Sequence, residues 1–570
     1  MTEQAPNRMA TRVLRGSLVA LLVVIGLAAC TLLEATPTPI AAPAPQPPVI
    51  APQPGVSGAV RPLGVQPGAL ARYDFTVTLD LVGDAAQVVQ FIDVTNPGPD
   101  TWTEVVFQVP AHLIENEQFV LSGVSIFDGL ETQAVRYLVS DGFIRVFLPQ
   151  PVPTNSGVGV SLVYGLSAIN TVVFSQMTRR PVGNVGVSPD GVLQFINWYP
   201  VLVPYRRGAG WLLWQSTSVG DPVVTETADY RLTVIAPDEE AVVISGGPTS
   251  REGRNWRFEV RGSRGVMFVV SKVGFTVSSA VVDGVTILSY YLPASELPGV
   301  AALEVAGKAL QLYNATFGTY PYNTLVVVQG AYLHSVAMGG MLVNTLKGYE
   351  DYDGQPTSLL VTLTAQGLSQ HWWGGVVGTN AVLEPWLAGS LQLYSEYLYF
   401  QTYHPEWEAW FWEARVDYWS PAGTLERTAY DFATTSALLR DIQRQGLRFL
   451  VDLRDQVGST VFDATLRDYY FSGAFNLTDS DDFFAALARN NSAPIAGVVA
   501  QYFEVRAVPT IALTERRDVT PTPPLVYVVQ PGDTLLGIAL QFGVDVEDLR
   551  RINGLGNDEP LSLGQRLTLP

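Results

Sequence analysis

The sequence predicts a multidomain protein: an all-β sandwich or sheet domain, then a mainly α-helical domain, then a small α+β module. Alternating polar and apolar residues indicate strands over 67–285, and helical periodicity begins at about residue 296. A strand–helix–helix–strand order occupies 526–570. With 570 residues, 47% of them apolar and 15% charged, the chain has enough apolar surface for several globular cores.

The first thirty residues form a targeting segment, which is excluded from the fold prediction. A basic start precedes an apolar run over 18–27 that is too short to span a bilayer comfortably. The run ends in LAAC at 27–30, which resembles the lipobox of bacterial lipoprotein signal peptides. This resemblance implies cleavage before Cys30, lipid on its thiol, and anchoring on the extracytoplasmic face of a bacterial membrane. An uncleaved signal anchor is the alternative. Cys30 is the single cysteine, so no intramolecular disulfide is possible.

Two proline-containing segments divide the remainder of the chain. Residues 31–66 are rich in Pro, Ala and Thr, and a shorter stretch of this kind lies within 506–525. Both are expected to be extended linkers because they cannot bury apolar surface. The formal net charge of −19 would repel phosphate backbones, so no nucleic-acid partner is expected.

The β domain is predicted over 67–285 and the helical domain over 286–505. In the first, β-branched runs such as 73–79, 242–245 and 266–270 are separated by turn-forming residues, which favours a sandwich or a large antiparallel sheet. In the second, apolar residues recur at helical spacing in five segments: 296–317, 357–371, 388–402, 428–443 and 480–490.

Several segments of the helical domain, taken in order, resemble the gluzincin zinc aminopeptidases, typified by aminopeptidase N. They are FGTYPY at 317–322 before the apolar strand 325–328, MGGM at 338–341, QHWWGG at 370–375, WL at 386–387 and YSE at 394–396. The β domain agrees through WYP at 198–200, GD at 220–221 and ETADY at 226–230. The resemblance covers about 67–505 and implies a β domain followed by a thermolysin-like catalytic domain.

This family binds zinc through H-E-x-x-H on a helix and a glutamate further along the chain, and the glutamate inside the motif is the general base. By the resemblance, Gln366 and Gln370 occupy the histidine positions, Gly367 the general-base position and Gly389 the third-ligand position. Amides are poor zinc ligands beside imidazole and carboxylate, and glycine has no side chain. We therefore expect no zinc cofactor and no aminopeptidase activity.

The family's substrate-binding positions are also changed. Its G-x-M-E-N loop binds the peptide amine through a glutamate, whereas here Leu342 follows GGM at 339–341. Tyr430 matches the family's oxyanion-stabilising tyrosine and is the one catalytic position that is kept. Because a lone phenol cannot replace a metal and a base, we expect Tyr430 to be a packed aromatic residue with a hydrogen-bonded hydroxyl.

A substitute site would have to draw on the four histidines of the chain: His112, His334, His371 and His404. A motif shifted by one residue fails, because Gly367 lies one helical turn before His371. His334 could line the cleft, and His404 is expected to end a helix because proline follows it. Five nearby aromatic residues are expected in the core or an interface, with a peptide or sugar pocket as the alternative: Trp407, Trp410, Phe411, Trp412 and Trp419.

Residues 526–570 resemble a LysM domain over their whole length. That family binds glycans containing N-acetylglucosamine, such as peptidoglycan or chitin, in a groove between two loops. The resemblance places the groove at seven residues: Gly532, Asp533, Thr534, Leu535, Leu555, Gly556 and Leu561. A LysM fold that has lost its ligand is the alternative.

Together these features predict a lipid-anchored cell-surface protein that binds peptidoglycan and carries a catalytically inactive peptidase-like body. The body would act as a scaffold or bind peptides or proteins in the former active-site cleft. Two alternatives stay open: a hydrolase with a rearranged site that uses His334, His371 or Tyr430, and a spacer that holds the LysM module away from the membrane.

Overall fold

The computed structural model describes residues 71–504, except 128–131, 171–183, 207–208, 215–216, 218, 221–222 and 332–333, together with parts of 526–568. The targeting segment with Cys30 and the two predicted linkers lie outside these residues. Within the described part of the chain, no helix has both the length and the apolar character needed to cross a membrane.

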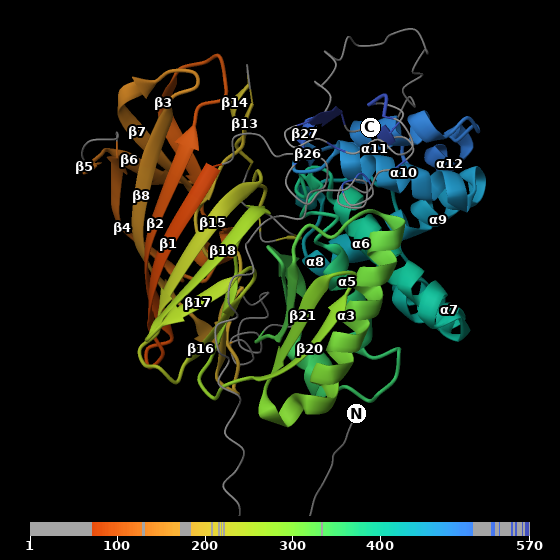
Figure 1. Cartoon of the computed structure of the whole chain (residues 1–570), viewed down its shortest axis with the longest axis horizontal. Coiled ribbons are helices and arrows are strands. Elements are labelled where there is room, and N and C mark those ends of the chain that lie inside the picture. Colours follow the sequence, from red (N-terminus) through yellow and green to blue (C-terminus); the bar gives the residue numbers. More distant parts are fainter. Residues whose placement is uncertain are drawn as a thin grey trace, which may run out of the picture. The chain divides into compact units, whose positions relative to one another are not determined.

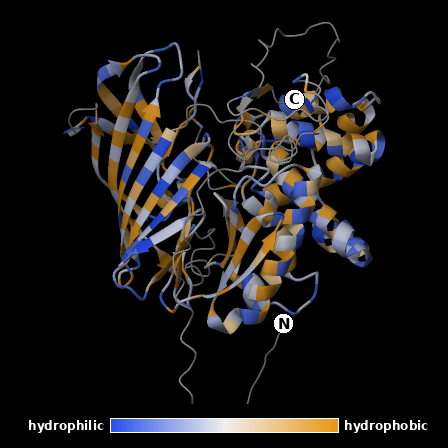
Figure 2. Cartoon of the chain, in the orientation of Figure 1, coloured by the Kyte–Doolittle hydropathy of each residue, from blue (hydrophilic) through white to orange (hydrophobic). Residues whose placement is uncertain are grey.

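An eight-stranded sheet is the largest element of the β domain (Figure 1). Its order is β17–β18–β15–β1–β2–β8–β4–β5; β1 and β15 pair in parallel and the other neighbours antiparallel. Buried and exposed residues alternate along β1 and β2, and Figure 2 shows the matching alternation in hydropathy. The strands are β1 (Ala71–Asp80), β2 (Ala85–Thr95), β4 (Phe119–Phe127), β5 (Thr132–Ala134), β8 (Gly157–Ser167), β15 (Ala228–Ile235), β17 (Thr249–Glu252) and β18 (Asn255–Ser263).

Two smaller sheets and a hairpin complete the β domain. One sheet has the order β16–β19–β11–β10–β9, the other β12–β3–β7–β6, and β13 pairs with β14. Their bounds are β3 (Trp102–Gln108), β6 (Tyr137–Ser140), β7 (Phe143–Val152), β9 (Ile169–Asn170), β10 (Val185–Val187), β11 (Val192–Phe195), β12 (Val201–Leu202), β13 (Tyr205–Arg206), β14 (Gly210–Trp211), β16 (Val242–Ser245) and β19 (Phe268–Ser271), with the short helix α1 (Ala111–Glu115).

Aromatic residues fill the core between these sheets. Tyr73 and Tyr230 lie directly opposite each other on β1 and β15 and stack with ring centroids 5.0 Å apart. Trp198 and Tyr199 are buried beside Phe75, with centroids 4.8 Å from it. Aromatic pairs of this geometry stabilise a core beyond the area that they bury. The predicted β domain is confirmed.

A second, five-stranded sheet belongs to the helical part of the chain. Its order is β20–β21–β22–β24–β23, and β21, β22 and β24 pair in parallel. Helix α3 (Glu296–Thr316) packs on β20 and β21 through small residues such as Ala302 and Ala306. The strands are β20 (Thr276–Val282), β21 (Val285–Tyr291), β22 (Thr324–Gln329), β23 (Val336–Met338) and β24 (Met341–Asn344), and the 3₁₀-helix η1 (Pro293–Ser295) precedes α3.

The predicted helices at 296–317, 357–371, 388–402 and 480–490 are confirmed as α3, α5, α6 and α11. The longer helices are α5 (Leu359–Ser369), α6 (Pro385–Tyr403), α9 (Gln445–Val457), α10 (Ser459–Ser472), α11 (Ser480–Asn490) and α12 (Ala496–Tyr502), with the shorter α4 (Leu346–Glu350). Strands β25 (Gly378–Thr379) and β26 (Leu477–Thr478) pair in parallel.

The helix predicted over 428–443 is wrong as a single element. The segment forms the 3₁₀-helix η5 (Ala429–Asp431), an extended residue at Phe432, helix α8 (Thr435–Leu438) and the π-helix η6 (Leu439–Arg444). The break lies at the extended residue Phe432 and at Thr434, whose side chain accepts a hydrogen bond from the N–H of Ala437 and begins a new helix; Thr428 caps only the first turn. The preceding segment has η2 (Pro405–Trp407), α7 (Glu408–Trp410), the π-helix η3 (Phe411–Val416) and η4 (Asp417–Trp419).

The C-terminal module has the predicted pairing of its first and last strands. Strand β27 (Val526–Val528) pairs antiparallel with β28 (Arg566–Thr568). Residues at 535, 538, 546, 549 and 550 are helical, in agreement with two intervening helices. Four buried residues form its separate core: Val529, Ile538, Leu549 and Leu567.

Candidate functional site

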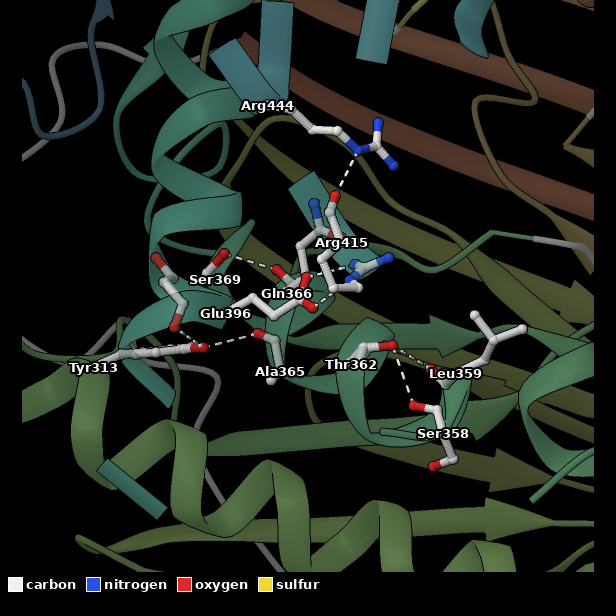
Figure 3. A network of polar contacts seen from close by, with 11 residues as sticks. Tyr313, Ser358, Leu359, Thr362, Ala365, Gln366, Ser369, Glu396, Arg415 and Arg444 are labelled. Carbon is white, nitrogen blue, oxygen red and sulfur yellow. Dashed lines mark hydrogen bonds and ion pairs between the residues drawn. The ribbon is translucent and has the colours of Figure 1, made fainter. Parts of the chain in front are cut away.

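Two adjacent helices carry the four positions at which the resemblance places the zinc site. Gln366 and Gly367 lie in the last turns of α5, Gln370 caps its C-terminal end, and Gly389 lies in the second turn of α6. The two helices pack against each other. Their contact is fixed by Tyr313, whose hydroxyl lies 3.0 Å from the carbonyl oxygens of both Ala365 on α5 and Ser395 on α6 (Figure 3).

The amide of Gln370 is fully engaged with the neighbouring strand. Its Oε1 accepts a hydrogen bond from the backbone N–H of Ala337 at 2.8 Å, and its Nε2 donates to the carbonyl oxygen of Ser335 at 3.3 Å. Because both the oxygen and the nitrogen of the amide bond to backbone groups of this strand segment, Gln370 acts here as a structural link between α5 and β23.

The space next to Gly367, where a side chain would stand, is filled by residues from the neighbouring sheet and the loop before it. A Cβ at Gly367 would lie 2.8 Å from Leu342 Cδ1 and 3.2 Å from Ser335 Cβ. Leu342 is fully buried. The two positions at which the family has carboxylates therefore complement each other: the apolar side chain at 342 takes the space that the glycine at 367 leaves.

Gly389 has a looser environment. A Cβ at this position would meet only the Cβ and Cγ of Gln443, both at 3.9 Å. Gln443 lies on the π-helix η6, and its side chain is largely buried. The predicted site is therefore tightly filled at Gly367 and only loosely packed at Gly389.

The donor set does not fit zinc. One amide is engaged by backbone groups, the second ligand position also carries an amide, and two positions have no side chain. Among the described residues, no cluster of three or more His, Cys, Asp or Glu side chains could hold a metal ion. No catalytic step can therefore be derived through a metal at this site.

A buried ion pair lies beside this site and has no counterpart in the sequence prediction. Glu396 of α6 is 0% exposed and accepts two hydrogen bonds from Arg415 of η3, at 2.8 and 2.7 Å (Figure 3). Burial raises the pKa of Glu396, and the charge and hydrogen bonds of Arg415 oppose that rise. The sequence does contain one sign of this pair, because Glu396 is a charged residue on an otherwise largely apolar helix. A carboxylate buried in such a helix requires a partner of opposite charge.

Arg444, the last residue of η6, lies next to that pair. Its Nε donates to the carbonyl oxygen of Arg415 at 2.7 Å, and its guanidinium lies 4.5 Å from the ring centroid of Trp419. Burial and the nearby charge of Arg415 together lower the pKa of Arg444 to about 10, while the charge of Glu396 opposes that change. Two π-helical segments, η3 and η6, thus place two arginines side by side.

Tyr430 is not the packed aromatic residue that was expected. Its side chain is 42% exposed, on the single turn η5. The reason is the break of the predicted helix: Ala429 is the buried residue of this turn and donates its N–H to the carbonyl oxygen of Val382 at 2.7 Å, which leaves the next side chain at the surface.

The histidines contribute to packing more than to a rearranged site. His371 is buried against Tyr320 and Tyr322, and its Nδ1 contacts the carbonyl oxygen of Leu368 at 3.1 Å. Burial lowers its pKa to about 4. His404 caps the C-terminal end of α6, as predicted.

The other two histidines lie in different settings. His112 is in α1 of the β domain, where burial lowers its pKa to about 4, whereas His334 is an exposed residue before β23.

Four of the five clustered aromatic residues belong to the core, as expected. Phe411 is buried, while Trp407, Trp410 and Trp412 are partly buried against the same cluster. Trp419 differs, because it is 42% exposed.

The predicted glycan groove is only partly covered by the described residues. Leu535, Leu555 and Leu561 are partly buried and pack on the core of the C-terminal module. Gly532, Asp533, Thr534 and Gly556 lie outside the described residues, so the groove itself stays a prediction.

Comparison with known proteins supports both resemblances. Residues 527–570 match the LysM domain family. Over 315 residues the chain is 22% identical to Aminopeptidase M1 of Arabidopsis thaliana, a match that covers 50% of this chain and 35% of that protein. Aminopeptidase M1-B of Oryza sativa subsp. japonica is 22% identical over 309 residues, with the same coverage. The chain thus matches about a third of the length of these relatives.

Solved structures give the same result for the fold. The M1 zinc metallopeptidase of Deinococcus radiodurans superposes with a TM-score of 0.54 at 16% identity, covering 77% of this chain and 94% of that one. A point variant of the same enzyme gives a TM-score of 0.55 and covers 78% and 96%. The predicted order of a β-sheet domain, a helical region and a C-terminal LysM domain is confirmed: the body of the chain has the fold of M1 zinc metallopeptidases, and residues 527–570 match the LysM domain family.

Proposed function

We propose that this chain is a lipid-anchored cell-surface protein that binds peptidoglycan through its LysM domain and carries a metal-free, catalytically inactive aminopeptidase-like body. The LysM match supports binding to a glycan that contains N-acetylglucosamine, and hence an association with the cell wall. Lipid on Cys30 would fix the other end of the chain to the membrane, and attachment at both ends would raise the local concentration of glycan sites.

The packing around Gly367 carries the proposal of inactivity. Leu342 and Ser335 lie where a general-base side chain would have to stand, and Gln370 is bonded to the strand beside them. Because this corner of the cleft is occupied by the chain's own side chains, a scaffold role is favoured there over capture of a peptide amine. The opposite side of the site, around Gly389, is less tightly packed.

Metal content and hydrolysis test the inactivity. Full-length protein dialysed against zinc and then against buffer should retain far less than one zinc per chain, and it should not cleave aminoacyl anilides. Stoichiometric zinc together with cleavage that a chelator abolishes would refute the proposal. Metal-independent cleavage that is lost in Tyr430→Phe or His371→Phe would instead establish the rearranged hydrolase.

Sedimentation with purified peptidoglycan tests the glycan role. The full chain should pellet with the insoluble glycan, and a chain that ends before residue 526 should stay in solution. Soluble N-acetylglucosamine oligomers should compete. Equal pelleting of both chains would exclude the LysM domain as the main contact.

Membrane partition tests the anchor. In a bacterial host, the chain should fractionate with membranes and Cys30→Ser should not. A Cys30→Ser variant that is still retained in membranes would favour the uncleaved signal anchor.

A further inference from the structure

Five arginines lie on η6 and around it, in a chain whose net charge is −19. Most of these arginines are paired: Arg415 with Glu396, and both Arg440 and Arg427 with Asp441. Arg448 bonds to Asp417 at 2.6 Å. Along this connected set, arginines outnumber the carboxylates that pair with them.

Arg444 is the member without a directly paired carboxylate, although the charge of Glu396 attracts it from further away. Within the described residues it makes no ion pair with Asp or Glu, and of its donors only Nε has a hydrogen-bonding partner, the carbonyl oxygen of Arg415. Its two Nη groups are therefore available to a ligand. A guanidinium that is partly buried and shares its surroundings with a second arginine gains most from an anion, because water no longer screens either charge fully.

The position of Arg444 links it to the degenerate site. Gln443, the residue before it, is the one that packs on Gly389, and Glu396 with Arg415 lies beside Gln366 on the facing helix (Figure 3). Both arginines come from π-helical segments, a backbone form that is rare and is frequent at functional sites.

An exposed aromatic surface adjoins the guanidinium. Trp419, on which Arg444 stacks, is 42% exposed, and Tyr418 beside it is 78% exposed. Exposed aromatic rings next to an unpaired arginine suit a ligand that combines an apolar part with a planar anion.

We propose that Arg444 and Trp419 form a binding site for a carboxylate-bearing ligand, with the carboxylate held by the Nη groups of Arg444. A carboxylate matches the planar fork of guanidinium through two parallel hydrogen bonds. The proposal rests on the proposed function, because peptidoglycan presents such groups both on its acidic sugar and on its peptides. The site would give the inactive body a second contact with the polymer that the LysM domain binds.

Ligand-observed NMR titration of the full chain tests the site with four probes. N-acetylmuramic acid represents the sugar carboxylate and acetyl-Ala-Ala the peptide carboxylate. N-acetylglucosamine and acetyl-Ala-Ala amide are their neutral controls. One of the two acids should bind the body at millimolar concentration, and whichever binds identifies the source. Because a charge-assisted hydrogen bond to Arg is lost, Arg444→Gln should weaken that binding by about tenfold or more.

Three further variants make the result decisive. Arg444→Lys keeps the charge but loses the fork and should give an intermediate affinity, while Trp419→Ala should also weaken binding. Arg257→Gln, at a paired surface arginine of β18, should leave binding unchanged. Thermal unfolding of each variant checks that the fold is kept. Equal binding of acid and neutral probes, or an Arg444→Gln protein that binds as tightly as the parent, would overturn the proposal.

A chain that ends before residue 526 separates this inference from the proposed function. It should still bind the acid probe while it no longer pellets with peptidoglycan. Normal pelleting of the full chain without any acid binding would overturn only the inference, whereas acid binding without pelleting of the full chain would overturn only the LysM role.

Discussion

An Arg415→Met variant removes the positive charge from the buried ion pair with Glu396 and keeps a side chain of comparable length. The carboxylate is 0% exposed and the guanidinium 17%. Removing one partner of such a pair leaves a buried charge uncompensated, at a cost of roughly 3–5 kcal/mol. At about 2–4 °C per kcal/mol for a domain of this size, the unfolding temperature of the helical domain should fall by roughly 6–20 °C.

The loss should depend on pH. Burial already raises the pKa of Glu396, and without Arg415 the pKa rises further. A carboxyl whose folded pKa is raised contributes stability below its unfolded pKa and loses that contribution as pH rises through the folded value. The deficit of Arg415→Met should therefore be smaller at about pH 5 than at about pH 8. Thermal unfolding followed by tryptophan fluorescence at both pH values measures it.

A double variant and a surface control complete the experiment. Glu396→Leu combined with Arg415→Met should recover most of the stability, because apolar replacement of a whole buried pair is often neutral. Arg489→Met breaks a similar two-bond pair with Asp468 at the surface, at 2.8 Å, and should cost no more than about 1 kcal/mol. A double variant as unstable as the single one, or a deficit independent of pH, would refute the reasoning.

Three further predictions follow from close contacts and burial. Gly367→Ala should destabilise the protein by about 1–3 kcal/mol because its Cβ meets Leu342, whereas Gly389→Ala, with space at 3.9 Å, should stabilise α6 by about 0.5–1 kcal/mol, as urea unfolding would show. The parent protein should lose stability as the pH falls from about 6.5 to 4, because His371, with a folded pKa of about 4, binds a proton less readily in the folded chain than in the unfolded one. His371→Phe removes this titrating group and should reduce that loss. Gly378→Ala should place a methyl group against the guanidinium of Arg264, which donates to the carbonyl oxygens of residues 225, 375 and 476. It should lower the unfolding temperature, and Arg264→Met, which removes the same three hydrogen bonds, should have a similar effect.

Each of these predictions has an outcome that would contradict it. Equal effects of alanine at 367 and 389 would show that packing at the former base position is not tight. An unchanged pH slope in His371→Phe would mean that other groups dominate acid unfolding. A Gly378→Ala protein as stable as the parent would show that Arg264 can move without losing its three carbonyl partners.

Much of the architecture was predictable because it depends on local periodicity. Strand alternation predicted the β domain, helical spacing predicted α3, α5, α6 and α11, and the strand–helix–helix–strand order predicted a small α+β module at the C-terminal end, which the resemblance identified as LysM. The prediction for 428–443 failed because the apolar spacing of the segment is helical, while Phe432 is extended and Thr434 caps a new helix inside it. The spacing of apolar residues predicts which side chains can face a core. It does not predict where a side-chain cap interrupts the helical backbone.

The sequence by itself determined which residue types stand at the four positions that the resemblance assigns to a zinc site: Gln366, Gly367, Gln370 and Gly389. Only the tertiary structure decided what stands in their place. Leu342 of strand β24 meets Gly367 of helix α5, and Arg415 and Arg444 come together from two π-helical segments beside Glu396. These contacts join residues far apart in the chain, and their geometry depends on how helices and strands pack rather than on any local pattern.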